Sequence, residues 1–108
     1  MPEQTEAELR FQKWLLDGLP ELKRLGYNPT YFLRMVGEHG AAEAVRMLVN
    51  SENEAEGFTR LWEMKRLDLS AEAIVAFNDD WADLFTDEDK KKARERLARY
   101  GYSTPNLP

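Results

Sequence analysis

Three aspartates in the last third of the chain have the spacing of a metal-binding motif. Asp79, Asp80 and Asp83 match the pattern Asp-Asp-x-x-Asp, in which carboxylates on one helix face hold magnesium ions against a diphosphate. That chemistry needs a large cavity for an isoprenoid chain, and 108 residues are too few to build one around their own core. We therefore expect an exposed acidic turn that caps a helix, and we predict neither a metal nor a cofactor.

His39 is the only histidine. A general base needs an orienting partner and a nucleophile within reach. Glu38 is its neighbour in sequence, but adjacent residues of a helix diverge by about 100°. The chain has no cysteine, and Ser51, Ser70 and Ser103 fall in cap or tail positions. The sequence therefore predicts no catalytic residue. His39 is expected at the C-terminus of a helix, where it interacts favourably with the helix dipole.

The only dense basic run lies near the C-terminus, between residues 90 and 99. Lys90, Lys91 and Arg94 can align into one stripe, and several cations on one face are what phosphate binding requires. The whole chain carries a formal charge of −5, which disfavours a general electrostatic attraction to nucleic acid. Because residues 87–89 are acidic and lie one turn away, we expect them to pair with some of these cations.

Residues 50–57 form the longest polar run and the most acidic stretch, which predicts a surface loop. Its carboxylates, Glu52, Glu54 and Glu56, are the candidate residues for binding a protein partner. Trp62 and Trp81 fit two roles, as core residues or as interface anchors, and the sequence leaves both open.

The segment from Phe58 to Phe77 has the proportions of a helix-turn-helix unit. Its second helix is expected to expose Glu72 and Asp79, which would repel the phosphates of DNA. We therefore interpret the segment as a packing unit.

The pattern of apolar residues and helix caps predicts an all-α fold, a compact single-domain bundle of about seven short helices. Capping boxes are expected at Thr5 to Glu8 and at Thr86 to Asp89, and Asn28 is expected to cap the helix that begins at Pro29. Trp14 and Tyr31 are expected on buried stripes. The helices are predicted over about 5–17, 20–25, 29–37, 41–49, 58–65, 70–77 and 86–100, with one further turn around residue 81.

The composition supports a folded, single domain over residues 1–102 with a flexible tail at 103–108. The chain is 43% hydrophobic and holds three Trp, four Tyr and five Phe residues, enough for one modest core. It has no secretory signal pattern and no apolar run of about 18 residues. We expect a cytoplasmic protein that does not insert into a membrane.

A set of short motifs resembles a small helical module of bacteria. The module is found as stand-alone proteins and as a C-terminal addition to longer proteins, some of them nuclease-like. The resemblance covers about residues 25–102 and implies a bacterial or phage origin and an accessory role, with no catalytic residue. The chain departs from the pattern at Met64-Lys65, where a glycine is expected. The motifs are LGYNPTYFL from residue 25, GFTRLWE from residue 57, RLDLSAEA from residue 66, LFT from residue 84 and RLARYGY from residue 96.

Two functional hypotheses follow. The first is a non-enzymatic protein-interaction module that docks on a protein partner through an apolar and acidic surface, as an inhibitor or adaptor in bacterial defence or phage counter-defence. The alternative is a nucleic-acid-binding accessory domain that uses Lys90, Lys91 and Arg94.

Overall fold

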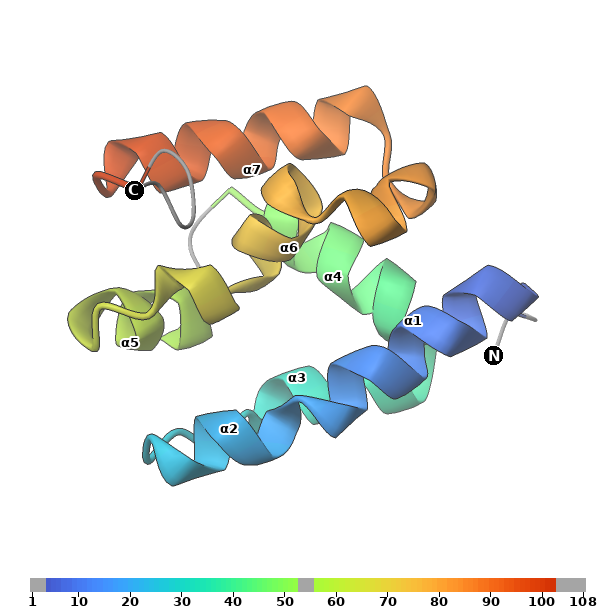
Figure 1. Ribbon diagram of the computed structural model, residues 1–108, viewed down its shortest axis with the longest axis horizontal. Helices are drawn as coiled ribbons and strands as arrows, with labels where there is room; N and C mark the ends of the chain where they lie inside the picture. The colour runs from blue at the N-terminus through green and yellow to red at the C-terminus, as the bar shows by residue number, and fades with distance from the viewer. Residues whose placement is uncertain (1–3, 53–55, 103–108) are drawn as a thin grey trace. The chain divides into compact units, whose positions relative to one another are not determined.

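The computed structural model describes residues 4–52 and 56–102. Within these ranges the chain forms seven α-helices and two 3-10 helices and contains no strand (Figure 1). The predicted all-α fold with about seven short helices is confirmed. The predicted flexible tail, residues 103–108, lies outside the described residues. No helix in the described part of the chain is long and apolar enough to cross a membrane.

The contacts divide the chain into two units, Met1–Ala44 and Val45–Pro108, and helix α4 runs through the boundary. The prediction of a single domain over residues 1–102 stays a prediction, and each unit is described by itself. The elements are α1 (Glu6–Asp17), α2 (Leu19–Arg24), α3 (Thr30–His39), α4 (Ala41–Asn50), α5 (Glu56–Glu63), η1 (Leu67–Leu69), α6 (Ala71–Phe77), η2 (Asp79–Leu84) and α7 (Asp87–Arg99).

Both predicted capping boxes are present. The Thr5 hydroxyl accepts a hydrogen bond from the Glu8 backbone N–H, and the Glu8 carboxylate accepts one from the Thr5 N–H at 2.9 Å. Thr86 and Asp89 make the same reciprocal pair at 3.0 Å. Each box satisfies backbone donors that the first turn of a helix leaves free, so α1 and α7 begin where the sequence predicts.

The first unit is built around Phe11, which is fully buried. Met35 and Val36 of α3 supply much of the remaining core, together with alanines at the start of α4. The side chain of Gln12 accepts a hydrogen bond from the Ala41 backbone N–H at 3.1 Å. A residue of α1 therefore caps the start of α4.

Three predictions for this unit are wrong. Tyr31 is 65% exposed and Trp14 is 42% exposed. Trp14 lies at the edge of its apolar stripe, where its ring stacks on Phe11. The hydroxyl of Tyr31 needs a hydrogen-bond partner, which water supplies when the side chain is exposed. The helix α3 begins at Thr30, with Pro29 at the N-cap position and no side-chain cap. Pro29 has non-helical backbone angles (φ −81°, ψ 57°), so the helix begins one residue later than predicted and Asn28 lies one position before the N-cap.

The second unit has α6 at its centre, where it packs against α7, η1 and η2 (Figure 1). Small side chains on α6 and α7, such as Ala73 and Ala93, are buried and allow this close packing. The buried apolar residues of this unit are Val45, Val49, Phe58, Leu61, Leu67, Ala73, Val75, Phe85, Ala93 and Leu97.

Three helices end on a residue with left-handed backbone angles. The residue is Gly26 after α2 (φ 90°), Lys65 after α5 (φ 61°) and Gly101 after α7 (φ 81°). Each end has the pair of backbone hydrogen bonds of the Schellman motif. In each pair, the bond that spans more residues joins Tyr27 N to Leu22 O at 3.0 Å, Arg66 N to Leu61 O at 2.8 Å or Tyr102 N to Leu97 O at 2.9 Å.

Candidate functional site

A buried ion pair joins α6 and α7 in the second unit. Arg96 is 4% exposed and Glu72 is 3% exposed, and the Arg96 Nη1 atom lies 2.8 Å from Glu72 Oε2. The sequence placed Glu72 on an exposed position, and this prediction is wrong. Because α6 packs against α7, position 72 is buried, and a carboxylate is tolerated there because the arginine neutralises it.

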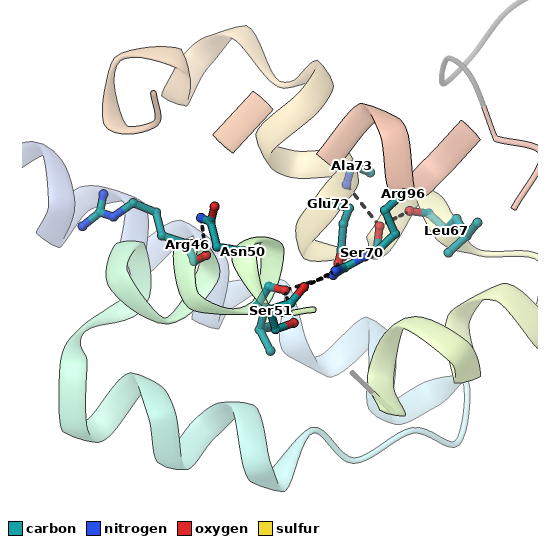
Figure 2. Close-up of polar contacts among 9 residues, drawn as sticks. Arg46, Asn50, Ser51, Leu67, Ser70, Glu72, Ala73 and Arg96 are labelled. Atoms are coloured by element: carbon teal, nitrogen blue, oxygen red, sulfur yellow. Dashed lines mark hydrogen bonds and ion pairs between the residues drawn. The ribbon is translucent and has the colours of Figure 1, made fainter. Parts of the chain in front are cut away.

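The same guanidinium also binds the end of α4. Arg96 Nη1 donates to the Leu48 carbonyl at 3.0 Å, and Nη2 donates to the Ser51 carbonyl. Figure 2 shows Arg96 between Glu72 and Ser51. The last carbonyls of a helix have no partner within the helix and favour a cation. Arg96 therefore joins the C-terminus of α4 to α6 and α7, in what we call the Arg96 network.

A second polar contact joins α4 to the start of α7. The Asn50 amide donates to Asp89 Oδ1 and to the Arg46 carbonyl, both at 2.8 Å. Burial on its own raises the pKa of Asp89, but the hydrogen bonds from Asn50 and from Thr86 favour the carboxylate, and the pKa lies below its usual value. Asp89 is therefore committed to Asn50 and to the capping box rather than to the basic run of α7.

The side chain of Tyr102 lies against Phe77, with ring centroids 6.3 Å apart. Burial raises the pKa of Tyr102, and the negative charge of Asp68 adds to the effect. The hydroxyl atom has no hydrogen-bond partner in the described residues. Tyr102 therefore acts as an apolar cover for the end of α6.

Ser70 and His39, two residues weighed above for catalysis, lie at helix ends. Ser70 is buried, and its hydroxyl donates to the Leu67 carbonyl at 2.7 Å and accepts from Ala73 N at 3.1 Å (Figure 2). His39 is half-buried at the last position of α3, where the sequence placed it. The Ser70 side chain therefore caps the start of α6.

The three aspartates of the Asp-Asp-x-x-Asp pattern, Asp79, Asp80 and Asp83, are exposed on η2. In residues 4–52 and 56–102, no three acidic or histidine side chains converge as a metal site requires. Asn78 caps η2 by accepting a hydrogen bond from Asp80 N at 3.0 Å.

A half-exposed tryptophan belongs to a small cluster of aromatic rings in the second unit. Trp62 of α5 is 45% exposed and contacts the Tyr100 ring edge-on at a centroid distance of 5.3 Å. Tyr100 in turn contacts Phe58 at 5.0 Å, and Phe58 is buried. We call these three residues the aromatic cluster. Trp81, the other tryptophan for which the sequence left two roles open, is half-buried.

Lys65 lies at the same end of α5 as Trp62. Its side chain is exposed, and its backbone N–H donates to the Trp62 carbonyl at 3.0 Å. The next residue, Arg66, makes a two-point ion pair with Asp68, with both N–O distances 3.1 Å. This end of α5 therefore carries an exposed indole and, three residues later in the chain, an exposed lysine.

The three residues of the predicted basic stripe lie on α7. Lys91 and Arg94 are exposed and Lys90 is half-buried, and within the described ranges no ion pair involves any of them. The expected pairing with residues 87–89 is not observed there. At helical spacing, Arg94 has lysines three and four residues before it and apolar residues after it, so α7 offers it no carboxylate. We call Lys90, Lys91 and Arg94 the α7 cation face.

The predicted acidic binding loop is only partly described. Glu52 is exposed, Glu54 lies outside the described residues, and Glu56 is the first residue of α5. The described part of the chain has a second acidic stretch, since residues 78–89 contain six carboxylates and no cation. Five of these side chains are exposed, and they belong to Asp79, Asp80, Asp83, Asp87 and Glu88.

Sequence reasoning missed the contact between Trp62 and Tyr100. The two residues are 38 positions apart, since 100 − 62 = 38, and no periodic pattern links them. Comparison of the chain with protein-family models, with curated proteins and with solved structures finds no match.

Proposed function

We propose that this protein is a non-enzymatic protein-interaction module that docks on a protein partner through the aromatic cluster. The observation that carries the proposal is the half-exposed indole of Trp62, held edge-on by Tyr100. Tryptophan and tyrosine are the residues that most often dominate the binding energy of protein interfaces.

The support beneath Trp62 strengthens the case for an anchor. Tyr100 rests on the buried ring of Phe58, so Trp62 has a fixed neighbour before any partner arrives. A side chain that is already ordered loses little conformational entropy on binding. Trp62 therefore offers a large apolar contact at a low cost.

The charge of the chain supports a protein partner over nucleic acid. The net charge of −5 opposes the approach of a polyanion. A role as inhibitor or adaptor in bacterial defence or phage counter-defence is the wider setting that we propose.

The experiment compares tagged wild-type protein with Trp62→Ala, Trp62→Phe and Trp14→Ala in affinity purification from the cells that make it. Each lysate is divided into nuclease-treated and untreated halves and analysed by mass spectrometry. We expect a partner that survives nuclease treatment, is lost with Trp62→Ala and is retained in part with Trp62→Phe. Trp14→Ala is the matched control, because Trp14 is also a half-exposed tryptophan stacked on a buried phenylalanine.

Two results would contradict the proposal. Capture of the same partner by wild type and Trp62→Ala would exclude the aromatic cluster as the anchor. A loss of every partner on nuclease treatment would exclude direct docking on protein. Circular dichroism of each variant is the folding control. A variant that loses the partner but keeps the wild-type spectrum has lost binding and not its fold.

A second function is favoured by one observation, the absence of ion pairs on the α7 cation face within the described residues. Lys90, Lys91 and Arg94 would then bind the phosphates of nucleic acid, as an accessory domain. Anisotropy of labelled single-stranded DNA and RNA, measured over a range of salt concentrations, tests this. Three phosphate contacts predict a slope of about −2 in log affinity against log salt.

The matched control for this test lies on the other flank of the same helix. Replacing Lys90, Lys91 and Arg94 by glutamine should abolish binding, whereas replacing Lys92 and Arg99 by glutamine should not. Equal losses in both variants would show that only the net charge matters, which would contradict a defined nucleic-acid face.

A further inference from the structure

Lys65 occupies a backbone conformation that the other two helix ends of this type reserve for glycine. Its φ is 61°, against 90° for Gly26 and 81° for Gly101, and the three ends share the same hydrogen bonds. A residue with a Cβ atom is strained in the left-handed region, whereas glycine is not. Strained residues of this kind cluster at functional sites, so the lysine side chain calls for a reason.

The contacts in the described residues give no structural reason for the lysine. Its side chain is exposed and takes part in no described ion pair. The nearest cation along the chain, Arg66, is already bound to Asp68 at two points. Lys65 is therefore the cation that this end of α5 leaves available to a ligand.

The position of Lys65 links its charge to the aromatic cluster. Lys65 N donates to the Trp62 carbonyl at 3.0 Å, so a backbone hydrogen bond joins the strained residue to the residue that carries the exposed indole. Trp62 is held in place by Tyr100. Residues three positions apart at a helix end lie about 5–6 Å from each other, so the long side chain of Lys65 can reach a ligand that covers the indole.

We propose that this end of α5 recognises a segment of a protein partner that presents a carboxylate beside an apolar side chain. The apolar side chain packs on Trp62 and Tyr100, and the carboxylate pairs with the Lys65 ammonium. This inference rests on the proposed function and names the chemistry of the partner segment. Charge complementarity selects an acidic segment, because an ammonium ion at the edge of an apolar contact favours an anion there and disfavours a cation.

Lys65→Gly separates recognition from structure. Glycine removes the ammonium group and also relieves the backbone strain, so this variant is expected to be more stable than wild type. A purely structural Lys65 predicts unchanged binding by the variant. A recognition role predicts weaker binding by a more stable protein, which loss of folding cannot produce.

The test follows the indole N–H resonances of the three tryptophans by NMR during titration with synthetic peptides, and Trp62→Phe assigns the signal of Trp62. The probe is a short peptide with a central phenylalanine flanked by aspartate and glutamate. The controls carry asparagine and glutamine in place of the acids, or alanine in place of phenylalanine. We expect the acidic peptide to shift the Trp62 signal, Lys65→Gly to weaken its binding about fivefold to tenfold, and Lys65→Arg to retain most of it.

Several outcomes would overturn the inference, and all of them differ from the outcome that would overturn the proposed function. Equal binding of the amide and acidic peptides, or unchanged binding by Lys65→Gly, would exclude recognition of a carboxylate. An absence of any shift with the acidic peptide would also exclude recognition of a carboxylate. A shift of the Trp62 signal produced only by single-stranded DNA would exclude it as well. The proposed function fails on a different result, the retention of the native partner by Trp62→Ala.

Discussion

Arg96 links three separate segments of the second unit through one guanidinium group. It is the common partner of Glu72, the Leu48 carbonyl and the Ser51 carbonyl. Arg96→Met keeps much of the side-chain volume but leaves the Glu72 carboxylate buried without this cation. We expect a loss of about 3–5 kcal/mol in the free energy of unfolding, measured by urea denaturation.

Two further variants isolate the cause of that loss. Arg94→Gln changes an exposed arginine on the same helix and should alter stability by less than about 0.5 kcal/mol. The double variant Arg96→Met, Glu72→Leu should recover a large part of the loss, because it removes the buried charge with its partner. A double variant no more stable than Arg96→Met would show that the carbonyl contacts of Arg96, and not its ion pair, stabilise the unit.

Asp89 gives the stability of the protein a defined dependence on pH. Its pKa in the folded protein lies below the ordinary value of 3.8, so the unfolded chain takes up the proton first as the pH falls. The stabilisation is therefore complete above pH 3.8 and is lost as the pH falls through the folded-state pKa. Each unit of difference between the two pKa values corresponds to about 1.4 kcal/mol.

Urea denaturation at a series of acidic pH values measures this effect. Asp89→Asn should flatten the decline in stability below pH 3.8, whereas Asp83→Asn, at an exposed position of η2, should leave the decline as it is in wild type. The same slope in wild type and Asp89→Asn would contradict the assigned role of the Asn50 and Thr86 hydrogen bonds.

At the scale of the element, the three left-handed helix ends form an internal comparison. A Cβ atom added to Gly26 meets no other atom within 4 Å, so Gly26→Ala changes only the backbone energy. We expect it to destabilise the protein by about 1 kcal/mol. Lys65→Gly makes the opposite change, and after the greater entropy of glycine in the unfolded chain is subtracted, it should stabilise by about 0.5–1 kcal/mol.

Thermal denaturation of the two variants, followed by circular dichroism, tests both signs at once. The Schellman hydrogen bonds are the same at both ends, so they do not account for a difference. A lower melting temperature for Lys65→Gly than for wild type would mean that the lysine side chain stabilises the fold itself, and the case for a strained, functional residue would be lost.

The elements that the sequence predicted correctly are those fixed by local chemistry. The capping boxes at Thr5 and Thr86 need only residues three positions apart, and both are observed. Gly26 and Gly101 end their helices with left-handed backbone angles, which glycine adopts without strain. The cap predicted at Asn28 is wrong because the backbone of Pro29 is not helical, which puts Pro29, a residue without a side-chain acceptor, at the N-cap position.

The parts of the site that the sequence could not predict depend on tertiary contacts. Glu72 looks like a surface residue until Arg96, 24 positions later, is placed against it. Trp62 could be core or interface, because its exposure depends on how much of the ring Tyr100 covers. Periodicity assigns a residue to a face of its own helix, but it does not say which other helix covers that face.

At the scale of the whole molecule, the negative net charge opposes the self-association that several exposed apolar side chains favour. Leu9, Trp14, Tyr31, Met47 and Trp62 are all at least 39% exposed. At neutral pH the net charge of −5 keeps molecules apart by mutual repulsion. Near the isoelectric point, about pH 4.9, that repulsion disappears and exposed apolar surface drives association.

Light scattering between about pH 7 and the isoelectric point should therefore show self-association that increases as the charge approaches zero. If the aromatic cluster is the most adhesive surface, Trp62→Ala should reduce this association more than Trp14→Ala, since the two tryptophans have similar exposure. The range stays above pH 3.8, so the loss of the Asp89 contribution does not enter. Equal association in the two variants would mean that exposed apolar area alone controls self-contact, and the aromatic cluster would have no special standing as a docking surface.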